Sequence, residues 1–248
     1  MKVRIKFRKY GALRFIGHLD VMRFFQKVMR RAQIPIAFTS GYSPHMIMSF
    51  ASPLGIGLTS DGEYFDIELT ESISSEEAVR RMNAVTAEGI EVVSFRQIAE
   101  EKKMTGMAIL AAADYLVGMS IEEEPGFFKK YKADFKAFLE QPQIIVMKKT
   151  KRSEQEVNIR PMIYQMDLQE NGVYLKLAAG SVKNLKPELV MSAFCQFAGI
   201  DEKEISYTWH RLEMYAQRAS DEWKEPEKRK LVSLESLGKI IESREIHD

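Results

Sequence analysis

Two histidines near the start of the chain are the side chains best suited to move a proton at neutral pH. His18 stands in "GHLD", just before an amphipathic stretch, and His45 stands in "GYSPHMIMSFASPLGIG", residues 41–57. Paired across that loop, they could cleave RNA without a metal, as general base and general acid. A tyrosine of the loop could also replace His45 as the partner of His18. For His18 and Asp20 the sequence favours structural roles, with Asp20 stabilising the helix start and His18 as a hydrogen-bonded turn residue, and His45 could equally bond to loop backbone. For His45 the residues alone do not choose between these interpretations.

Positive charge is concentrated in the same part of the chain. Residues 1–60 hold ten bases and one acid, a net charge of +9, whereas residues 61–101 hold eleven acids and three bases, a net charge of −8. Such asymmetry favours a separate basic face for an anionic partner, unless the two segments neutralise each other. Phosphate backbones bind basic faces because each neutralised phosphate releases counterions.

Unpaired bases can also stack on aromatic side chains, of which this segment has several. The predicted RNA contacts therefore combine bases with residues of the loop: Lys6, Arg8, Arg14, Arg23, Lys27, Arg30, Arg31, Tyr42, His45 and Ser49.

Metal and membrane chemistry find no support in the sequence. The four histidines are widely spread, and the single cysteine, Cys195, cannot hold a cluster or form an internal disulfide. We therefore expect no metal and no other cofactor. No apolar run is long enough to span a membrane, and the start "MKVRIKFRKY" lacks the features of a signal peptide. A cytoplasmic location is expected.

Two elements position the basic residues. The segment "KVRIKFRK" alternates with period two, which predicts a strand with its even-numbered bases on one face. The segment "HLDVMRFFQKVMRRAQI", residues 18–34, predicts a helix that Pro35 ends, with bases opposite an apolar side. Later elements are a strand at 34–39, a strand pair with its turn at residues 60–62, a helix at 74–85 and a strand at 90–98.

A similar order recurs in the second half: strand 107–121, helix 125–141, strands 143–149 and 172–180, helix 186–199 and strand 204–216. The sequence thus predicts an α+β protein with two tandem ferredoxin-like (βαββαβ) domains, both with antiparallel sheets, at residues 1–100 and 104–216. Residues 219–248 are predicted to be a charged linker and a helical tail. That tail either docks on its own domain or binds a partner.

One family shares the long pattern "LRFIGHLD…RRA…IPIAFTSGYSPH" found within residues 11–69. The chain resembles the bacterial radical-SAM-linked proteins, a domain of unknown function found beside or fused to radical SAM proteins. "VNIRPMI" and "NLKPELV" are similar to its later motifs, so the resemblance covers most of residues 1–215. Positions that match are Arg14, His18, Asp20, Arg23, Arg30, Arg31, His45 and Ser49. Met46-Ile47 stand where the family usually has Pro-Lys, which removes a loop cation.

The resemblance implies a radical SAM partner, often cobalamin-binding, and RNA-related work. We therefore expect a non-catalytic, RNA-binding accessory protein that presents tRNA or rRNA to that enzyme. One alternative is a metal-independent endoribonuclease resembling the CRISPR repeat-processing enzymes, with His18 and His45 as catalytic residues; their glycine-rich C-terminal motif is missing here. Another is a protein-interaction scaffold for the radical SAM partner.

Overall fold

The computed structural model describes residues 1–120, 130–149, 154–170, 172–217 and 230–243. The chain forms two compact units, the first made of Met1–Ala111 with Glu213–Asp248 and the second of Ala112–Leu212. The first unit therefore combines the beginning and the end of the chain, a division that differs from consecutive domains at 1–100 and 104–216.

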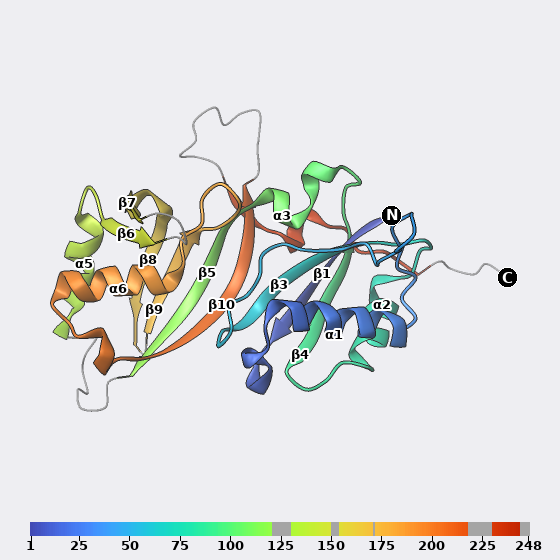
Figure 1. Ribbon diagram of the computed structural model, residues 1–248, viewed down its shortest axis with the longest axis horizontal. Helices are drawn as coiled ribbons and strands as arrows, with labels where there is room; N and C mark the ends of the chain where they lie inside the picture. Colours follow the sequence, from blue (N-terminus) through green and yellow to red (C-terminus); the bar gives the residue numbers. More distant parts are fainter. Residues whose placement is uncertain (121–129, 150–153, 171, 218–229, 244–248) are drawn as a thin grey trace. The chain divides into compact units, whose positions relative to one another are not determined.

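The first unit has the expected order of strand, helix, two strands, helix and strand, although not every element lies where it was expected (Figure 1). The elements are β1 (Lys2–Lys9), α1 (His18–Arg31), β2 (Met48–Phe50), β3 (Thr59–Glu68), α2 (Ser75–Asn83) and β4 (Ile90–Gln97). Strand β1 lies between β4 and β3, β2 pairs with β3, and all these pairings are antiparallel. Ser74 caps α2 by accepting a hydrogen bond from the Glu77 amide.

Strand alternation builds the core of this unit. Val3, Ile5 and Phe7 point to the face that α1 covers, where Phe25 packs at 4.7 Å from the Phe7 ring centroid. Phe65 of β3 completes the cluster, 4.6 Å from Phe25. Because side chains in a strand alternate between faces, the next odd position of β1 belongs to this buried face as well, and it is Lys9.

Several local expectations for residues 31–62 are wrong. Helix α1 ends at Arg31, before Gln33 with its positive φ of 53°. Residues 34–39 make only isolated bridges, and the strand that pairs with β3 is β2, inside the glycine- and proline-rich segment. No turn interrupts β3 at residues 60–62. The pairing of β3 with β1 contains a bulge there instead, because β3 has one more residue than β1 between the pairs Phe7↔Glu63 and Lys9↔Ser60.

The second unit differs more from expectation. Its elements are β5 (Leu110–Ser120), α5 (Lys132–Glu140), β6 (Ile145–Lys149), β7 (Glu154–Asn158), β8 (Ile163–Gln169), β9 (Gly172–Ala178), α6 (Pro187–Ala198) and the first part of β10 (Ser206–Gln217), whose residues from Glu213 on belong to the first unit. The strand order is β10-β5-β9-β8, and β6 pairs only with β7 in a separate two-stranded sheet. The predicted strand at 143–149 is therefore not in the main sheet. Strand β8, which the sequence did not predict, lies beside β9 instead.

The expected α+β class with a large antiparallel sheet is confirmed, whereas a tandem repeat of one ferredoxin-like fold is not. The predicted tail helix is also wrong, since that segment forms β11 (Leu231–Ser233), which pairs with β10, and a short 3-10 turn at Glu235–Leu237. Leu234 is fully buried, and Gln97 and Lys239 exchange backbone hydrogen bonds. The described part of the tail thus docks on its own unit, while the predicted linker lies mostly outside the described residues.

Candidate nucleic-acid interface and an adjoining pocket

The even-numbered face of β1 is not an open basic surface. Arg4 is 1% exposed, and its Nε and Nη2 atoms donate to both Asp66 oxygens at 2.8 and 3.0 Å. It also donates to the carbonyl oxygens of Leu234 and Met104, and the Gly106 amide donates to Asp66 at 2.7 Å. We name Arg4, Asp66 and these three backbone groups the Arg4 clasp. It joins β1 and β3 to the C-terminal segment.

Lys6 is likewise enclosed by acids. Its Nζ atom lies 2.8 Å from Glu213 and 3.3 Å from Glu235, and only 15% of the side chain is exposed. Desolvation acts to lower the pKa of Lys6, but hydrogen bonds and charge from Glu213 and Glu235 outweigh it and raise the pKa. The pKa of Tyr64 is also raised, first by burial and then by the Glu213 carboxylate, which accepts a hydrogen bond from the Tyr64 hydroxyl.

The remaining bases of β1 are paired too. Arg8 lies 3.4 Å from Asp61 and 3.2 Å from Glu91, and Lys2 lies 3.8 Å from Glu68. Acids of residues 61–101 therefore pair with Lys2, Arg4 and Arg8, whereas Glu213 and Glu235 withdraw Lys6 from any phosphate. The side chain of Arg8 remains 45% exposed. The broad positive surface expected from strand and helix together is thus reduced mainly to the helix.

Helix α1 keeps its positive charge in solvent. Arg23, Lys27, Arg30 and Arg31 are all exposed, and their spacing places them along one side of the helix. We name these four residues the α1 basic stripe. Among the described residues, only Arg23 has a carboxylate within 4.0 Å, that of Asp20 at 3.7 Å, and both of those side chains are more than 60% exposed. Exposed pairs of this kind contribute little, so the stripe remains available to an anion.

Aromatic side chains in the segments before and after α1 are exposed as well. The Arg14 guanidinium lies 4.7 Å from the ring centroid of Phe15, which is 61% exposed. Tyr42 is fully exposed in the loop after α1. Ser49 is half-buried in β2, opposite Asp66.

His45 is engaged within its own hairpin. The His45 Nδ1 atom lies 3.1 Å from the Thr39 hydroxyl oxygen, and that oxygen also accepts a hydrogen bond from the His45 amide. The His45 carbonyl in turn accepts a hydrogen bond from the Thr39 amide. These contacts match the structural interpretation of this residue.

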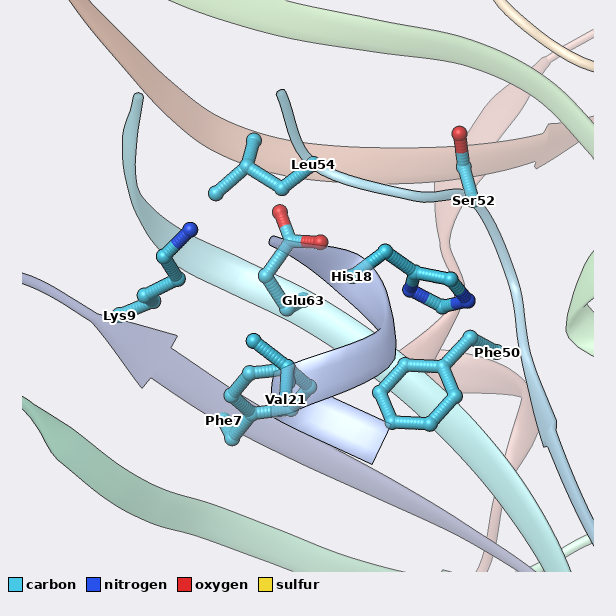
Figure 2. Close-up of a pocket in the computed structure, with 8 residues that line it drawn as sticks. All are labelled: Phe7, Lys9, His18, Val21, Phe50, Ser52, Leu54 and Glu63. Carbon is cyan, nitrogen blue, oxygen red and sulfur yellow. The ribbon is translucent and has the colours of Figure 1, made fainter. Parts of the chain in front are cut away.

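His18 lines a small pocket at the start of α1 (Figure 2). The other polar side chains at the pocket are Lys9, Glu63 and Ser52, and the apolar wall comes from Phe7, Val21, Phe50 and Leu54. Figure 2 shows the Glu63 carboxylate between the Lys9 amine and the His18 ring. The enclosed space holds about one water-sized group. His45 is not among the lining residues, so this pocket does not bring the two histidines together.

Strand alternation explains why charged groups lie in this pocket. Lys9 follows Val3, Ile5 and Phe7 on the buried face of β1, and Glu63 precedes Phe65 on the buried face of β3. Lys9 and Glu63 are 1% and 2% exposed, and the Lys9 amine donates to the Ile16 carbonyl at 3.1 Å. We did not single out either residue from the sequence. Their odd-numbered positions in an alternating strand were the signal that could have identified them.

His18 is set up as a neutral hydrogen-bonding group. Its ring meets Phe50 edge to face, with 5.0 Å between centroids, and among the described residues no group hydrogen-bonds to its ring nitrogens. Desolvation lowers the pKa of His18, so the imidazole is unprotonated at neutral pH. A neutral imidazole offers one donor and one acceptor.

The single cysteine lies outside this pocket and has a structural role. Cys195 is buried with its Sγ atom 3.3 Å from the Tyr207 hydroxyl, and burial raises the pKa of its thiol. In the described parts of the chain, no three His, Cys, Asp or Glu side chains are grouped as a metal site would need. No helix in those parts is long and apolar enough to cross a membrane.

The fold and the exposed bases define a mixed α+β protein with a basic helix on its first unit. The chain belongs to a family described as "Uncharacterized protein conserved in bacteria (DUF2344)", whose model matches residues 2–187. That description names no radical SAM protein, so the expected partner is not shown. Comparison with curated proteins gives no match.

A solved structure titled "Crystal Structure of a Cbf5-Nop10-Gar1 Complex" shares 12% identity with a TM-score of 0.45. The similarity covers 86% of this chain and 48% of the other, so this chain spans about half the length of its match. At that score the likeness carries no argument about function.

Proposed function

We propose that this protein binds RNA through the α1 basic stripe and acts as a non-catalytic accessory that presents the RNA to a radical SAM enzyme. The observation that carries the proposal is the row of solvated cations along α1. Most bases of β1 are paired or buried, yet those of α1 face solvent. A phosphate backbone gains affinity from such a row because counterions are released as each phosphate is neutralised.

Exposed aromatic side chains in the segments that flank α1 favour RNA over an acidic protein. Phe15, with Arg14 over its ring, and Tyr42 present aromatic faces to solvent. Unpaired bases stack on such faces, and RNA is recognised largely through unpaired segments such as the loops of tRNA and rRNA. The radical SAM enzyme, which the resemblance often makes a cobalamin-binding one, enters the proposal through that family resemblance alone. The endoribonuclease alternative loses support because His45 does not line the pocket that His18 lines.

Charge reversal on α1 tests the RNA proposal. The variant R23E/K27E/R30E removes three exposed cations, and the matched control K132E/K183E/K203E reverses three exposed lysines of the second unit. Binding to a labelled single-stranded RNA is measured by fluorescence anisotropy from roughly 50 to 200 mM salt. Losing three phosphate contacts should reduce the slope of log affinity against log salt by about 2.

The control should bind as the wild type does. The proposal is wrong if the wild type shows no salt-dependent RNA binding, or if both variants weaken it equally. A wild type that ignores RNA but co-purifies with a co-expressed radical SAM enzyme would instead support the scaffold alternative.

A further inference from the structure

The pocket at the start of α1 is polar inside but carries no net formal charge. Lys9 and Glu63 have opposite charges, and the lowered pKa leaves His18 neutral. A pocket that balances its own charge gives little attraction to a whole phosphate or an ammonium group. Its space for about one water-sized group also excludes a phosphate on size.

The group that fits is one that both donates and accepts hydrogen bonds. The Glu63 carboxylate accepts, and the His18 imidazole can do either through its two ring nitrogens. A hydroxyl has one donor and two acceptor positions and is about the size of water. Hydroxyl groups therefore match the pocket in size, charge and hydrogen-bonding capacity.

Exposed apolar side chains stand close in the chain to His18 and Leu54 of the pocket. Phe15, Leu19 and Ile56 are 61%, 60% and 66% exposed. Leu19 follows His18, and the Ile56 Cδ1 atom lies 3.9 Å from where a Cβ on Gly17 would stand. The loop of Ile56 is held there by a hydrogen bond from the Gly57 amide to the Arg14 carbonyl at 2.8 Å. A ligand with a flat ring next to its hydroxyl could pack on these side chains.

We propose that this pocket receives a ribose 2′-hydroxyl of the RNA bound along α1. The inference rests on the proposed function and names the feature by which RNA is recognised. Helix α1 has 14 residues and is about 21 Å long, and His18 lies at its start on the side of Val21 and Phe25, about 160° around the axis from the stripe. An RNA strand bound along the stripe must therefore pass over the start of the helix to place a ribose at the pocket. The 2′-hydroxyl is the group that distinguishes RNA from DNA at a given site. The stripe supplies affinity for any phosphate backbone, and the pocket supplies the preference for RNA.

Ligand substitution tests this assignment without altering the protein. Affinities of the wild type are compared for one sequence as RNA, as DNA and as 2′-O-methyl RNA, whose added methyl exceeds the available space. Loss of one well-placed hydrogen bond should weaken DNA by about tenfold relative to RNA. The methylated RNA should be weakened at least as much.

Protein variants then locate the preference. His18→Phe keeps an aromatic ring but removes both nitrogens, and His210→Phe in the second unit is the matched control. H18F should bind RNA and DNA about equally with an unchanged salt slope, whereas R23E/K27E/R30E should weaken both ligands and keep their ratio. In NMR spectra of the wild type, the His18 ring signals should shift with RNA and not with DNA.

The outcomes separate the two proposals. Equal wild-type affinity for RNA and DNA, or an RNA preference that persists in H18F, overturns the pocket assignment and leaves binding by the stripe intact. Absence of salt-dependent RNA binding overturns both. A pocket whose polar residues are purely structural would give the first of these results.

Discussion

Removing the Asp66 carboxylate should destabilise the first unit strongly, because it leaves the Arg4 charge buried. The carboxylate accepts two hydrogen bonds from Arg4, at 2.8 and 3.0 Å, and one from the Gly106 amide at 2.7 Å. The side chains of Arg4 and Asp66 are only 2% and 6% exposed. Breaking a buried pair by deleting one partner costs about 3–5 kcal/mol. Asp66→Ala should therefore reduce the ratio of folded to unfolded protein by more than about a hundredfold.

Urea unfolding followed by circular dichroism measures this loss, and hydrogen exchange locates it. Exchange should accelerate at β1, at β3 and at the Leu234 amide, because Arg4 also donates to the Leu234 carbonyl. Arg23→Ala is the matched control, since its pair with Asp20 is 3.7 Å long and exposed. That variant should change stability by less than about 0.5 kcal/mol.

A second substitution separates charge from packing. In Arg4→Met/Asp66→Ala the uncompensated charge is gone, so the double variant should be no less stable than Asp66→Ala alone. The reasoning about the Arg4 clasp is refuted if Asp66→Ala costs less than about 1 kcal/mol, within the range of exposed pairs.

Two further predictions concern the same unit. Gly106→Ala places a Cβ 2.9 Å from that of Ala51, so it should lower the free energy of unfolding in urea by about 1–3 kcal/mol. The double variant Gly106→Ala/Ala51→Gly should recover that stability. Gly55→Ala is the control because its Cβ meets only a flexible Leu58 side chain at 3.4 Å, and an equal loss of stability in both single variants would contradict the steric cause. Because burial lowers the pKa of His18 beside Lys9 and Glu63, the unfolded chain binds the proton more readily, and stability is lost as the pH falls from about 7 through the folded pKa. His18→Gln should make the stability of the protein less dependent on pH between about 7 and 5 in urea titrations, and an unchanged pH profile would show that this histidine is not desolvated.

Much of the first unit was predictable because its signals are local. Period-two alternation marked β1, helical spacing with Pro35 marked α1, and Ser74 with its early glutamates marked the start of α2. The errors share a physical cause. Residues 60–62 have turn composition, but pairing with β1 absorbs them in a bulge, and Met48–Phe50 becomes a strand because β3 is there to bond it.

The candidate site divides in the same way. The bases of α1 were identified correctly as exposed, since an amphipathic helix must turn its charged side outward once its apolar side is buried. Those of β1 were misjudged, because the sequence does not reveal what covers the second face of a strand. Glu213 and Glu235, more than 200 residues further along, enclose Lys6.

The sequence by itself determined the class of the protein, the charge of its beginning and the solvated side of α1, because these follow from composition and from periodicity within one element. Tertiary structure alone decided which of those charges remain available. Long-range packing brought Asp66 to Arg4 and Glu63 to the face that holds Lys9, and it closed a water-sized pocket next to His18. Burial and pairing depend on neighbours distant in the chain, and no local pattern encodes them.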